Sequence, residues 1–248
     1  MSLHRLVERY SASCQKCRKV AELFALTEAA FRELGFDKLA LVHGLWFRRP
    51  SPNLIRLDNF GEYADIFIER RFYEDDPALL ACQRTNTAFS WTDIGRLIDI
   101  EPRHEIVLDE ARRHGLVSGM TLPVGVAGEP PGCCSFATAK AQLPCIWRCR
   151  AAAFIGAEAF REARRLHRLP LRKRRVPGLS PRKLEVVRLA TIGKSDREIA
   201  MILNLKRSTV ETYMAQLRQA FDVYSRTQIC LTAVRLGLIG FEDAMSGF

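Results

Sequence analysis

The sequence predicts a two-domain α/β protein, in which an N-terminal α/β/α sandwich precedes an all-α domain of four helices. Helix-like and strand-like hydrophobic patterns alternate through the first two thirds of the 248 residues. Short helices with clear start signals fill the last 70 residues, and a basic segment with two prolines separates the two parts. We therefore expect a first domain at 1–168, a linker at 169–178 and a second domain at 179–248.

The first domain alternates helix and strand signals along its length. Residues 20–36 form an amphipathic helix pattern that Gly35 ends, and Asp76-Pro77 marks a break before a short helix that runs through Gln83. Helices are also expected at 60–72, at 102–114 and from Ile146 to about His167, with strands at 39–45, 120–126 and 133–139. Helices that flank one sheet leave an interior that can hold an apolar ligand.

The second domain carries a serine near the start of each expected helix. These serines are Ser180, Ser195, Ser208 and Ser225. Ser180 precedes a proline at the first helical position, and Ser195 begins a capping box with Glu198. Asn204 suits a left-handed turn after the second helix. A short turn between the second helix and a third helix at about 208–221 predicts a helix-turn-helix, whose second helix enters the major groove of DNA.

The formal charge of +10 is concentrated near the C-terminal end. Residues 1–163 carry 21 basic and 21 acidic residues, whereas residues 164–178 carry seven basic residues and no acidic one. A neutral body with a basic end favours a polyanionic partner, most often nucleic acid. The alternative interpretation is a solvated helix end followed by a soluble linker.

The stretch from Leu179 to Gln228 closely resembles the LuxR-type helix-turn-helix. The matching residues are the LSPR opening, Gly193-Lys194-Ser195, Glu198-Ile199-Ala200, Thr209-Val210 and the DVYSR segment that ends at Arg226. The resemblance implies that the third helix contacts DNA and that the fourth helps to pair two subunits on a palindromic site. The DNA-contacting residues it implies are Lys194, Lys206, Arg207, Ser208, Thr209, Glu211, Thr212 and Arg218.

Three positions depart from the pattern of that module. Lys183 stands where the family usually has a glutamate after the Pro-Arg pair. Lys206 replaces the serine that usually caps the third helix, so we expect capping to pass to Ser208. Glu211 stands where the family usually has a basic residue. An acid there loses a phosphate contact but can accept a hydrogen bond from a cytosine amino group.

The first domain resembles the autoinducer-binding domain of the same family, through Tyr63-x-x-x-Phe67, Asp76-Pro77, Trp91, Gly119 and Ser135. The resemblance implies an N-acyl- or aryl-homoserine lactone as the signal ligand, with Asp76 accepting its amide N–H. Tyr63 and Ser135 can donate hydrogen bonds, whereas Phe67 has no donor. The apolar wall is expected from Trp91, Phe72, Phe89 and Phe136. The alternative is that Asp76 only caps a helix and that Trp91 only anchors the core.

Several classes of protein lack support in this sequence. No apolar stretch approaches the roughly 18–20 residues of a membrane-spanning helix, and the N-terminus has no apolar signal core, so we expect a cytoplasmic protein. The eight cysteines are expected to be reduced thiols. Cys14-x-x-Cys17 has no second pair at zinc-site spacing, and no nucleotide-binding or catalytic motif occurs. We therefore expect no enzyme, no metal and no cofactor other than the signal ligand.

The sequence thus predicts a ligand-responsive transcription regulator that binds a palindromic promoter site as a homodimer. RNA polymerase is a further candidate partner. Lys183 lies in the part of the module that would face it and departs from the family pattern, so the sequence leaves activation and repression both open. Two alternatives remain open at this point. The regulator could respond to a small molecule that is not a lactone, or the helix-turn-helix could bind a protein partner without contacting DNA.

Overall fold

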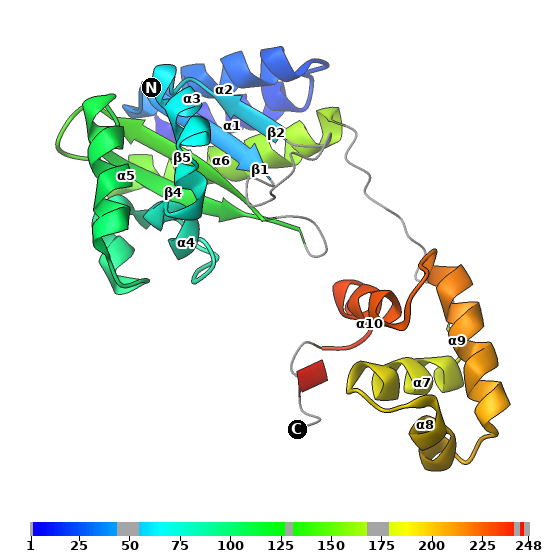
Figure 1. Cartoon of the computed structure of the whole chain (residues 1–248). Coiled ribbons are helices and arrows are strands. Elements are labelled where there is room, and N and C mark those ends of the chain that lie inside the picture. Colours follow the sequence, from blue (N-terminus) through cyan, green and yellow to red (C-terminus); the bar gives the residue numbers. More distant parts are fainter. Residues whose placement is uncertain (1, 44–54, 127–130, 168–178, 241–243, 246–248) are drawn as a thin grey trace. The chain divides into compact units, whose positions relative to one another are not determined.

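We analysed a computed structural model of the chain, which describes residues 2–43, 55–126, 131–167, 179–240 and 244–245. The chain divides into two compact units, Met1–Leu169 and Pro170–Phe248 (Figure 1). The expected linker at 169–178 lies outside the described residues, so its boundaries stay a prediction.

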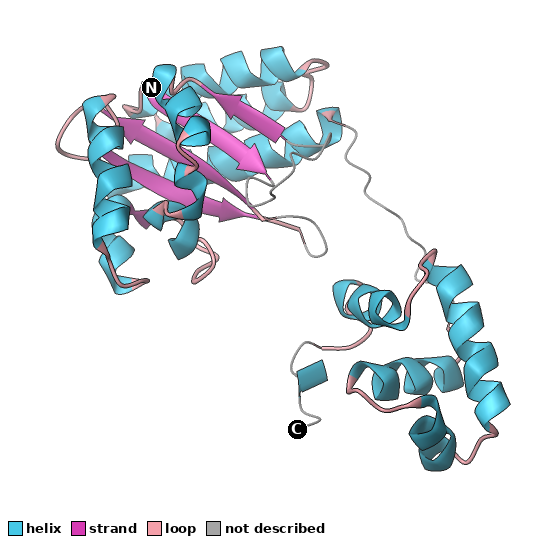
Figure 2. Ribbon diagram, viewed as in Figure 1, coloured by secondary structure: helices cyan, strands magenta, loops and turns pink. Residues whose placement is uncertain are grey.

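The first unit contains a five-stranded antiparallel sheet with strand order β2-β1-β5-β4-β3 (Figure 2). Its strands are β1 Lys38–His43, β2 Ile55–Asp58, β3 Phe89–Ser90, β4 Ser118–Val124 and β5 Gly132–Thr138. The expected strands at 39–45, 120–126 and 133–139 correspond to β1, β4 and β5. The short strands β2 and β3 were not expected.

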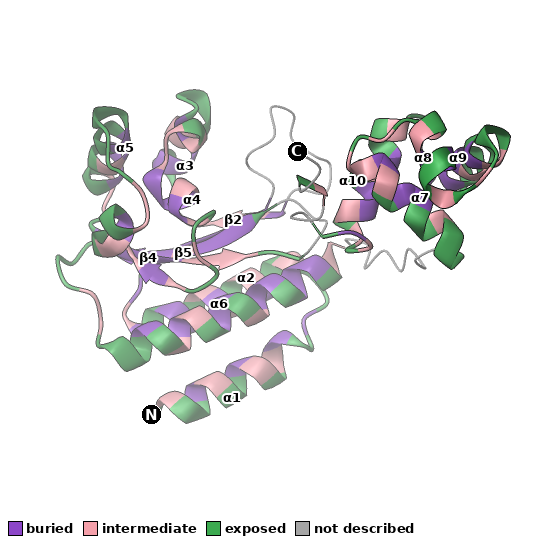
Figure 3. Cartoon of the chain, turned by 90° about the horizontal axis from the view of Figure 1, so that it is seen from below, coloured by how far each residue is buried: buried purple, intermediate pink, exposed green. Residues whose placement is uncertain are grey.

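Helices cover both faces of the sheet, which confirms the predicted α/β/α sandwich. Figure 3 shows α1, α2 and α6 on one face and α3, α4 and α5 on the other. Their bounds are α1 Leu3–Cys14, α2 Val20–Leu34, α3 Glu62–Glu69, α4 Pro77–Ala81, α5 Pro102–Arg113 and α6 Ile146–Leu166, with 3₁₀ segments η1 Phe72–Glu74 and η2 Trp91–Arg96. The sequence patterns missed α1.

Two of the expected helices end where the backbone turns left-handed. Gly35, with φ of 96°, ends α2 as predicted, because glycine adopts this conformation without steric cost. The helix expected at 60–72 is shorter and ends at Glu69. Arg71 has φ of 56°, which no α-helix can continue through, and η1 follows it.

The strands send alternate residues to opposite faces of the sheet. On β5, Phe136 packs between Phe31 and Phe36 on the α1, α2 and α6 face, with ring centroids 5.1 and 4.8 Å away. Ser135 therefore points to the face covered by α3, α4 and α5. The prediction that Phe136 lines a ligand pocket is wrong, because its position on the strand places it in the hydrophobic core.

In the second unit, the helices α7 to α10 pack around a core of their own. They are α7 Pro181–Thr191, α8 Asp196–Leu203, α9 Arg207–Phe221 and α10 Arg226–Arg235. Each of these helices contributes fully buried side chains to one core, namely Val187, Ile199, Val210, Leu217 and Ile229. Burying each such side chain contributes roughly 1.5–3 kcal/mol, so this small unit has a core of its own.

Most predicted helix signals of this unit are confirmed. Ser180, Ser195 and Ser225 cap α7, α8 and α10, and Asn204 ends α8 with φ of 52°. Capping by Ser208 is wrong. Helix α9 begins one residue earlier, with Lys206 at the N-cap and no side-chain hydrogen bond there.

No helix within the described ranges is both long and apolar enough to cross a membrane.

Candidate functional site

A cavity lies between the sheet and the helices α3, α4 and α5. Its floor is formed by the sheet face that carries Ala40, Val42, Cys133 and Ser135, and its other walls are mostly apolar. All five residues predicted to bind ligand line this cavity, although they come from four separate segments. These residues are Tyr63, Phe67, Asp76, Trp91 and Ser135.

Asp76 serves both as a helix cap and as part of the cavity wall. Its carboxylate accepts hydrogen bonds from the backbone N–H of Ala78, at 2.8 Å, and of Leu79. Burial raises the pKa of Asp76 from 3.8 to about 6, and the two backbone bonds oppose this rise. At neutral pH the cavity therefore contains an ionised acceptor that is held in place by α4.

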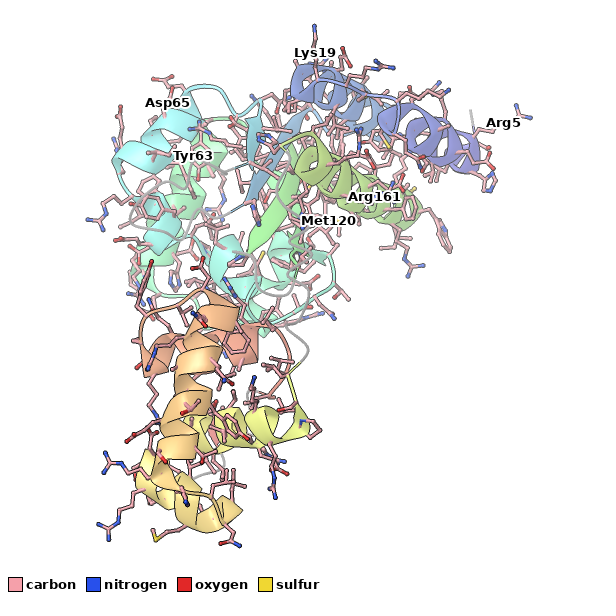
Figure 4. All side chains as sticks on the ribbon, turned by 90° about the vertical axis from the view of Figure 1, so that its right-hand side faces the viewer. Arg5, Lys19, Tyr63, Asp65, Met120 and Arg161 are labelled. Atoms are coloured by element: carbon pink, nitrogen blue, oxygen red, sulfur yellow. The ribbon has the colours of Figure 1, made fainter. Side chains whose placement is uncertain are left out.

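Tyr63 and Phe67 lie one helical turn apart on α3, with ring centroids 5.8 Å from each other. Figure 4 labels Tyr63 on α3. Met120, labelled in the same figure, does not line the cavity and belongs to the core on the α6 side of the sheet. Burial, and then the nearby Asp76 charge, raise the pKa of Tyr63 above its ordinary value. Its hydroxyl therefore stays protonated, and it has no hydrogen-bond partner among the described residues, which leaves it free to donate to a ligand.

Trp91 is fixed by its contacts with the strand β4. Its ring lies so close to Gly119 that an added Cβ there would be 2.8 Å from three ring atoms. Its indole Nε1–H donates to Thr121 Oγ1 at 2.9 Å. The Trp91 ring thus faces the cavity, while its polar N–H bonds to the sheet. Gly119 is needed because only a residue without a side chain allows this approach.

Ser135 brings a hydroxyl group to the floor of the cavity. Its Oγ lies 2.9 Å from Thr121 Oγ1 and 3.9 Å from Cys133 Sγ. Thr121 and Ser135 are paired across β4 and β5, which explains why their hydroxyls meet.

Among the cavity residues that the sequence analysis did not name are Arg56, Asp58 and Phe60. Arg56 Nε donates to Asp58 Oδ2 at 2.8 Å, so an ion pair lies in a largely apolar wall. The signal that could have revealed β2 is the alternation of apolar Ile55 and Leu57 with the charged Arg56 and Asp58. Conversely, Phe72 and Phe89 were expected in the wall but do not line the cavity. Phe89 packs in a separate cluster with Ala81 and Ile94.

In the second unit, seven of the eight predicted DNA-contacting residues lie at the N-cap of α9 or on α9 itself, whereas Lys194 lies between α7 and α8. Lys206, Arg207, Ser208, Glu211 and Thr212 are exposed, whereas Lys194, Thr209 and Arg218 are half-buried. Arg207 Nε donates to Glu211 Oε1 at 2.8 Å. The Glu211 carboxylate, which would repel a phosphate, is thus paired with the Arg207 guanidinium. The DNA-contact roles of all eight residues stay predictions.

Comparison with known families decides the identity of both units. Residues 19–161 match the autoinducer-binding domain, and residues 177–233 match the bacterial regulatory proteins of the luxR family. The chain belongs to the LuxR-type regulators with an autoinducer-binding domain. The resemblance inferred from the sequence is therefore confirmed. Members of this family are transcription regulators that respond to autoinducers.

Curated relatives match this LuxR-type chain over nearly its whole length. The quorum-sensing-dependent transcriptional regulator RpaR of Rhodopseudomonas palustris is 26% identical over 244 residues, covering 94% of this chain and 88% of RpaR. The quorum-sensing regulator RhlR of Pseudomonas aeruginosa is 28% identical over 233 residues, covering 88% of this chain and 89% of RhlR.

The fold of this LuxR-type chain is also found in solved structures. SdiA in complex with octanoyl-rac-glycerol superposes with a TM-score of 0.65 at 21% identity, over 95% of this chain and 96% of SdiA. A crystal structure of Escherichia coli SdiA gives the same TM-score over 96% of this chain. At this identity the likeness establishes the shared fold of the two units.

Proposed function

We propose that this LuxR-type regulator binds an N-acyl- or aryl-homoserine lactone in the cavity of its first unit and controls promoters as a homodimer. The observation that carries the proposal is the position of Asp76, an ionised acceptor on the wall of a mostly apolar cavity. A buried carboxylate is costly even with the two backbone hydrogen bonds it accepts, so such a site favours a ligand that brings a further hydrogen-bond donor.

The polar groups around Asp76 match the polar centre of such a signal. The ligand amide N–H would donate to Asp76, and the Tyr63 and Ser135 hydroxyls would donate to ligand carbonyl oxygens. The aromatic rings of Phe60, Phe67 and Trp91 would enclose the acyl or aryl group. RpaR and RhlR are both quorum-sensing regulators by name, which supports a quorum-sensing signal as the ligand here.

On the DNA side, the proposal assigns α9 to the major groove. In a homodimer, two such helices would contact the half-sites of a palindrome whose centres lie about 34 Å apart. The exposed residues Lys206, Arg207 and Ser208 at the start of α9 are placed to contact phosphates or base edges. A cytoplasmic location is part of this proposal, and a contact with RNA polymerase stays a prediction.

The ligand proposal is tested by a thermal-shift panel of acyl- and aryl-homoserine lactones with the full chain. A ligand that binds only the folded state at 100 times its Kd raises the free energy of unfolding by about 2.7 kcal/mol. The matched control is each compound with its lactone ring opened. Absence of stabilisation by every lactone, in a folded sample, would contradict the proposal.

One observation favours a second candidate, a signal that is not a lactone. Phe67 has no donor, and the Trp91 indole N–H is already bonded to Thr121, so two aromatic side chains of the cavity wall offer no donor to a lactone carbonyl. The fold relative SdiA holds octanoyl-rac-glycerol. Mass spectrometry of ligand extracted from the purified protein separates the two classes, because an intact lactone supports the first proposal and an acylglycerol the second.

DNA binding is tested by selecting genomic fragments on the full chain and measuring affinity against salt. A DNA-binding dimer should retain specific fragments and lose affinity steeply as salt rises. Salt-insensitive binding without any specific fragment would instead favour the protein-interaction alternative.

A further inference from the structure

A chain of three hydrogen-bonding side chains runs behind the floor of the cavity. Trp91 Nε1 lies 2.9 Å from Thr121 Oγ1, which lies 2.9 Å from Ser135 Oγ. Only the first and last of the three residues line the cavity, and Thr121 is fully buried between them. The strand pairing of β4 with β5 and the close approach of Trp91 to Gly119 fix the positions of all three.

The direction of the hydrogen bonds in this chain follows from the donors available. An indole N–H can only donate, so Thr121 Oγ1 must accept from Trp91. The Thr121 hydroxyl has no exposed surface, so its own hydrogen needs a protein acceptor. Among the described residues, Ser135 Oγ is the one acceptor in reach of it. If Ser135 donated to Thr121 instead, the Thr121 hydrogen would be left buried without a partner.

We propose that Trp91 acts through Thr121 as a positioning residue, which fixes Ser135 as a hydrogen-bond donor toward the cavity. Since Ser135 Oγ accepts from Thr121, its own hydrogen turns away from the sheet. The other hydrogen-bonding atom near Ser135 Oγ within the described chain is Cys133 Sγ, at 3.9 Å, and a thiol sulfur is a weak acceptor. A ligand carbonyl oxygen is a better acceptor for this hydrogen.

This inference rests on the proposed function and adds to it which polar group of the cavity donates a hydrogen bond to the ligand and which accepts one. The cavity contains a fixed acceptor, the Asp76 carboxylate, and a fixed donor, the Ser135 hydroxyl. Such a pair matches the N–H and the C=O of a secondary amide. A ligand that presents only a donor to Ser135 would leave the Ser135 hydrogen without a good acceptor, whereas a ligand carbonyl oxygen accepts it.

The test uses Thr121→Val, which keeps the shape of a buried side chain that does not line the cavity but removes the hydroxyl. We expect it to weaken binding of the lactone that most stabilises the wild type by about threefold to tenfold. Thr121→Ser should restore affinity, because it restores the hydroxyl. The matched control is Thr138→Val, at a buried threonine of β5 that does not line the cavity.

A double-mutant cycle separates positioning from a general effect on structure. In a Ser135→Ala background, Thr121→Val should cause no further loss of affinity, because the hydroxyl that it orients is gone. Trp91→Phe should lose less affinity in the Ser135→Ala background than in the wild type, because only its own contact with the ligand is then removed. Equal losses in both backgrounds, measured by calorimetry, would overturn the proposal.

A ligand-free measurement keeps this inference distinct from the lactone assignment. In the proton NMR spectrum of the full chain, the Thr121 hydroxyl proton should exchange slowly and show a nuclear Overhauser contact with the Ser135 β protons. A hydroxyl proton on Ser135 that points to Thr121 would overturn the inference, whatever the ligand is. Failure of every lactone to bind, with this contact present, would contradict the proposed function alone.

Discussion

The two units hold their functional groups in opposite environments. In the first unit, Asp76, Tyr63 and Ser135 converge on a cavity that is shielded by three helices and a sheet. In the second unit, Lys206, Arg207 and Glu211 stand exposed on one short stretch of chain. A hydrogen bond in a shielded cavity is electrostatically stronger than one at the surface, where water and salt screen each charge.

This difference predicts two kinds of mutational behaviour. Single substitutions around the cavity should change ligand affinity strongly, and their effects should depend on one another through shared hydrogen bonds. Substitutions on α9 should each change DNA affinity by a small amount that depends on salt. Four experiments test this contrast.

The largest effect is expected from Asp76→Asn. Asparagine caps helices as well as aspartate does, so α4 should remain intact. Loss of the charge-assisted bond to the ligand N–H should weaken lactone binding by roughly 10- to 100-fold, or about 1.5–3 kcal/mol. Isothermal titration calorimetry measures the change. Asp75→Asn is the neighbouring control, and equal affinities of the two variants would place the ligand away from Asp76.

Gly119→Ala should cost about 1–3 kcal/mol of the free energy of unfolding, because the new methyl group would lie 2.8 Å from the Trp91 ring. The displaced ring should also disturb the cavity and weaken ligand binding. Urea denaturation measures the loss of stability. The control is Gly95→Ala, since no atom lies within 4 Å of a Cβ added there. A Gly119→Ala variant as stable as the control would show that Trp91 moves freely.

The raised pKa of Asp76 predicts opposite pH trends for stability and binding. Because its pKa rises from 3.8 to about 6 on folding, the folded chain binds more protons between these values. Stability from this group is therefore highest below pH 3.8 and is lost as pH rises through about 6. Ligand binding needs the ionised form, so the apparent Kd should rise about tenfold when pH falls one unit below that pKa.

Calorimetry and urea denaturation at several pH values test these trends. The Asp76→Asn variant should lose both of them and should unfold less readily than the wild type above about pH 6, because no buried charge remains. If the variant keeps the pH dependence of the wild type, another group controls it.

The smallest effect is expected on α9. Glu211→Gln removes the acid that pairs with Arg207, which frees the guanidinium for a phosphate. We expect DNA affinity to rise about two- to fivefold and the salt dependence to steepen by less than one released counterion. Glu185→Gln, on α7, breaks a similar exposed pair with Arg182 and is the control. A loss of affinity and specificity would instead show that Glu211 contacts a base.

The sequence predicted the second unit more completely than the first, for a physical reason. Capping by Ser195 and the left-handed turn at Asn204 depend on bonds within five residues, so local spacing reveals them. The start of α9 was misplaced because Lys206, in extended conformation, begins the helix without a side-chain bond. The helix-start rule that favoured Ser208 relies on such a bond.

In the first unit, family resemblance located the five cavity residues, but the strand pattern could not assign faces. On β5, Cys133, Cys134 and Phe136 are all buried, because this central strand is covered on both sides. A continuous apolar run carries no alternation from which to separate cavity from core. Phe136 was misplaced for this reason, and the missed β2 hid Arg56 and Asp58.

The alternation along β5 has a consequence for how such receptors can diverge. Cys133 and Ser135 line the cavity, while Cys134 and Phe136 hold the sheet against the opposite helix layer. Selection for a new signal can therefore act on the odd-numbered positions while the even-numbered ones keep the domain folded. A single inserted residue in this strand would exchange the two sets and abolish both properties at once. Point substitutions in this strand can therefore change the ligand specificity and keep the fold, whereas an insertion or deletion would disrupt both.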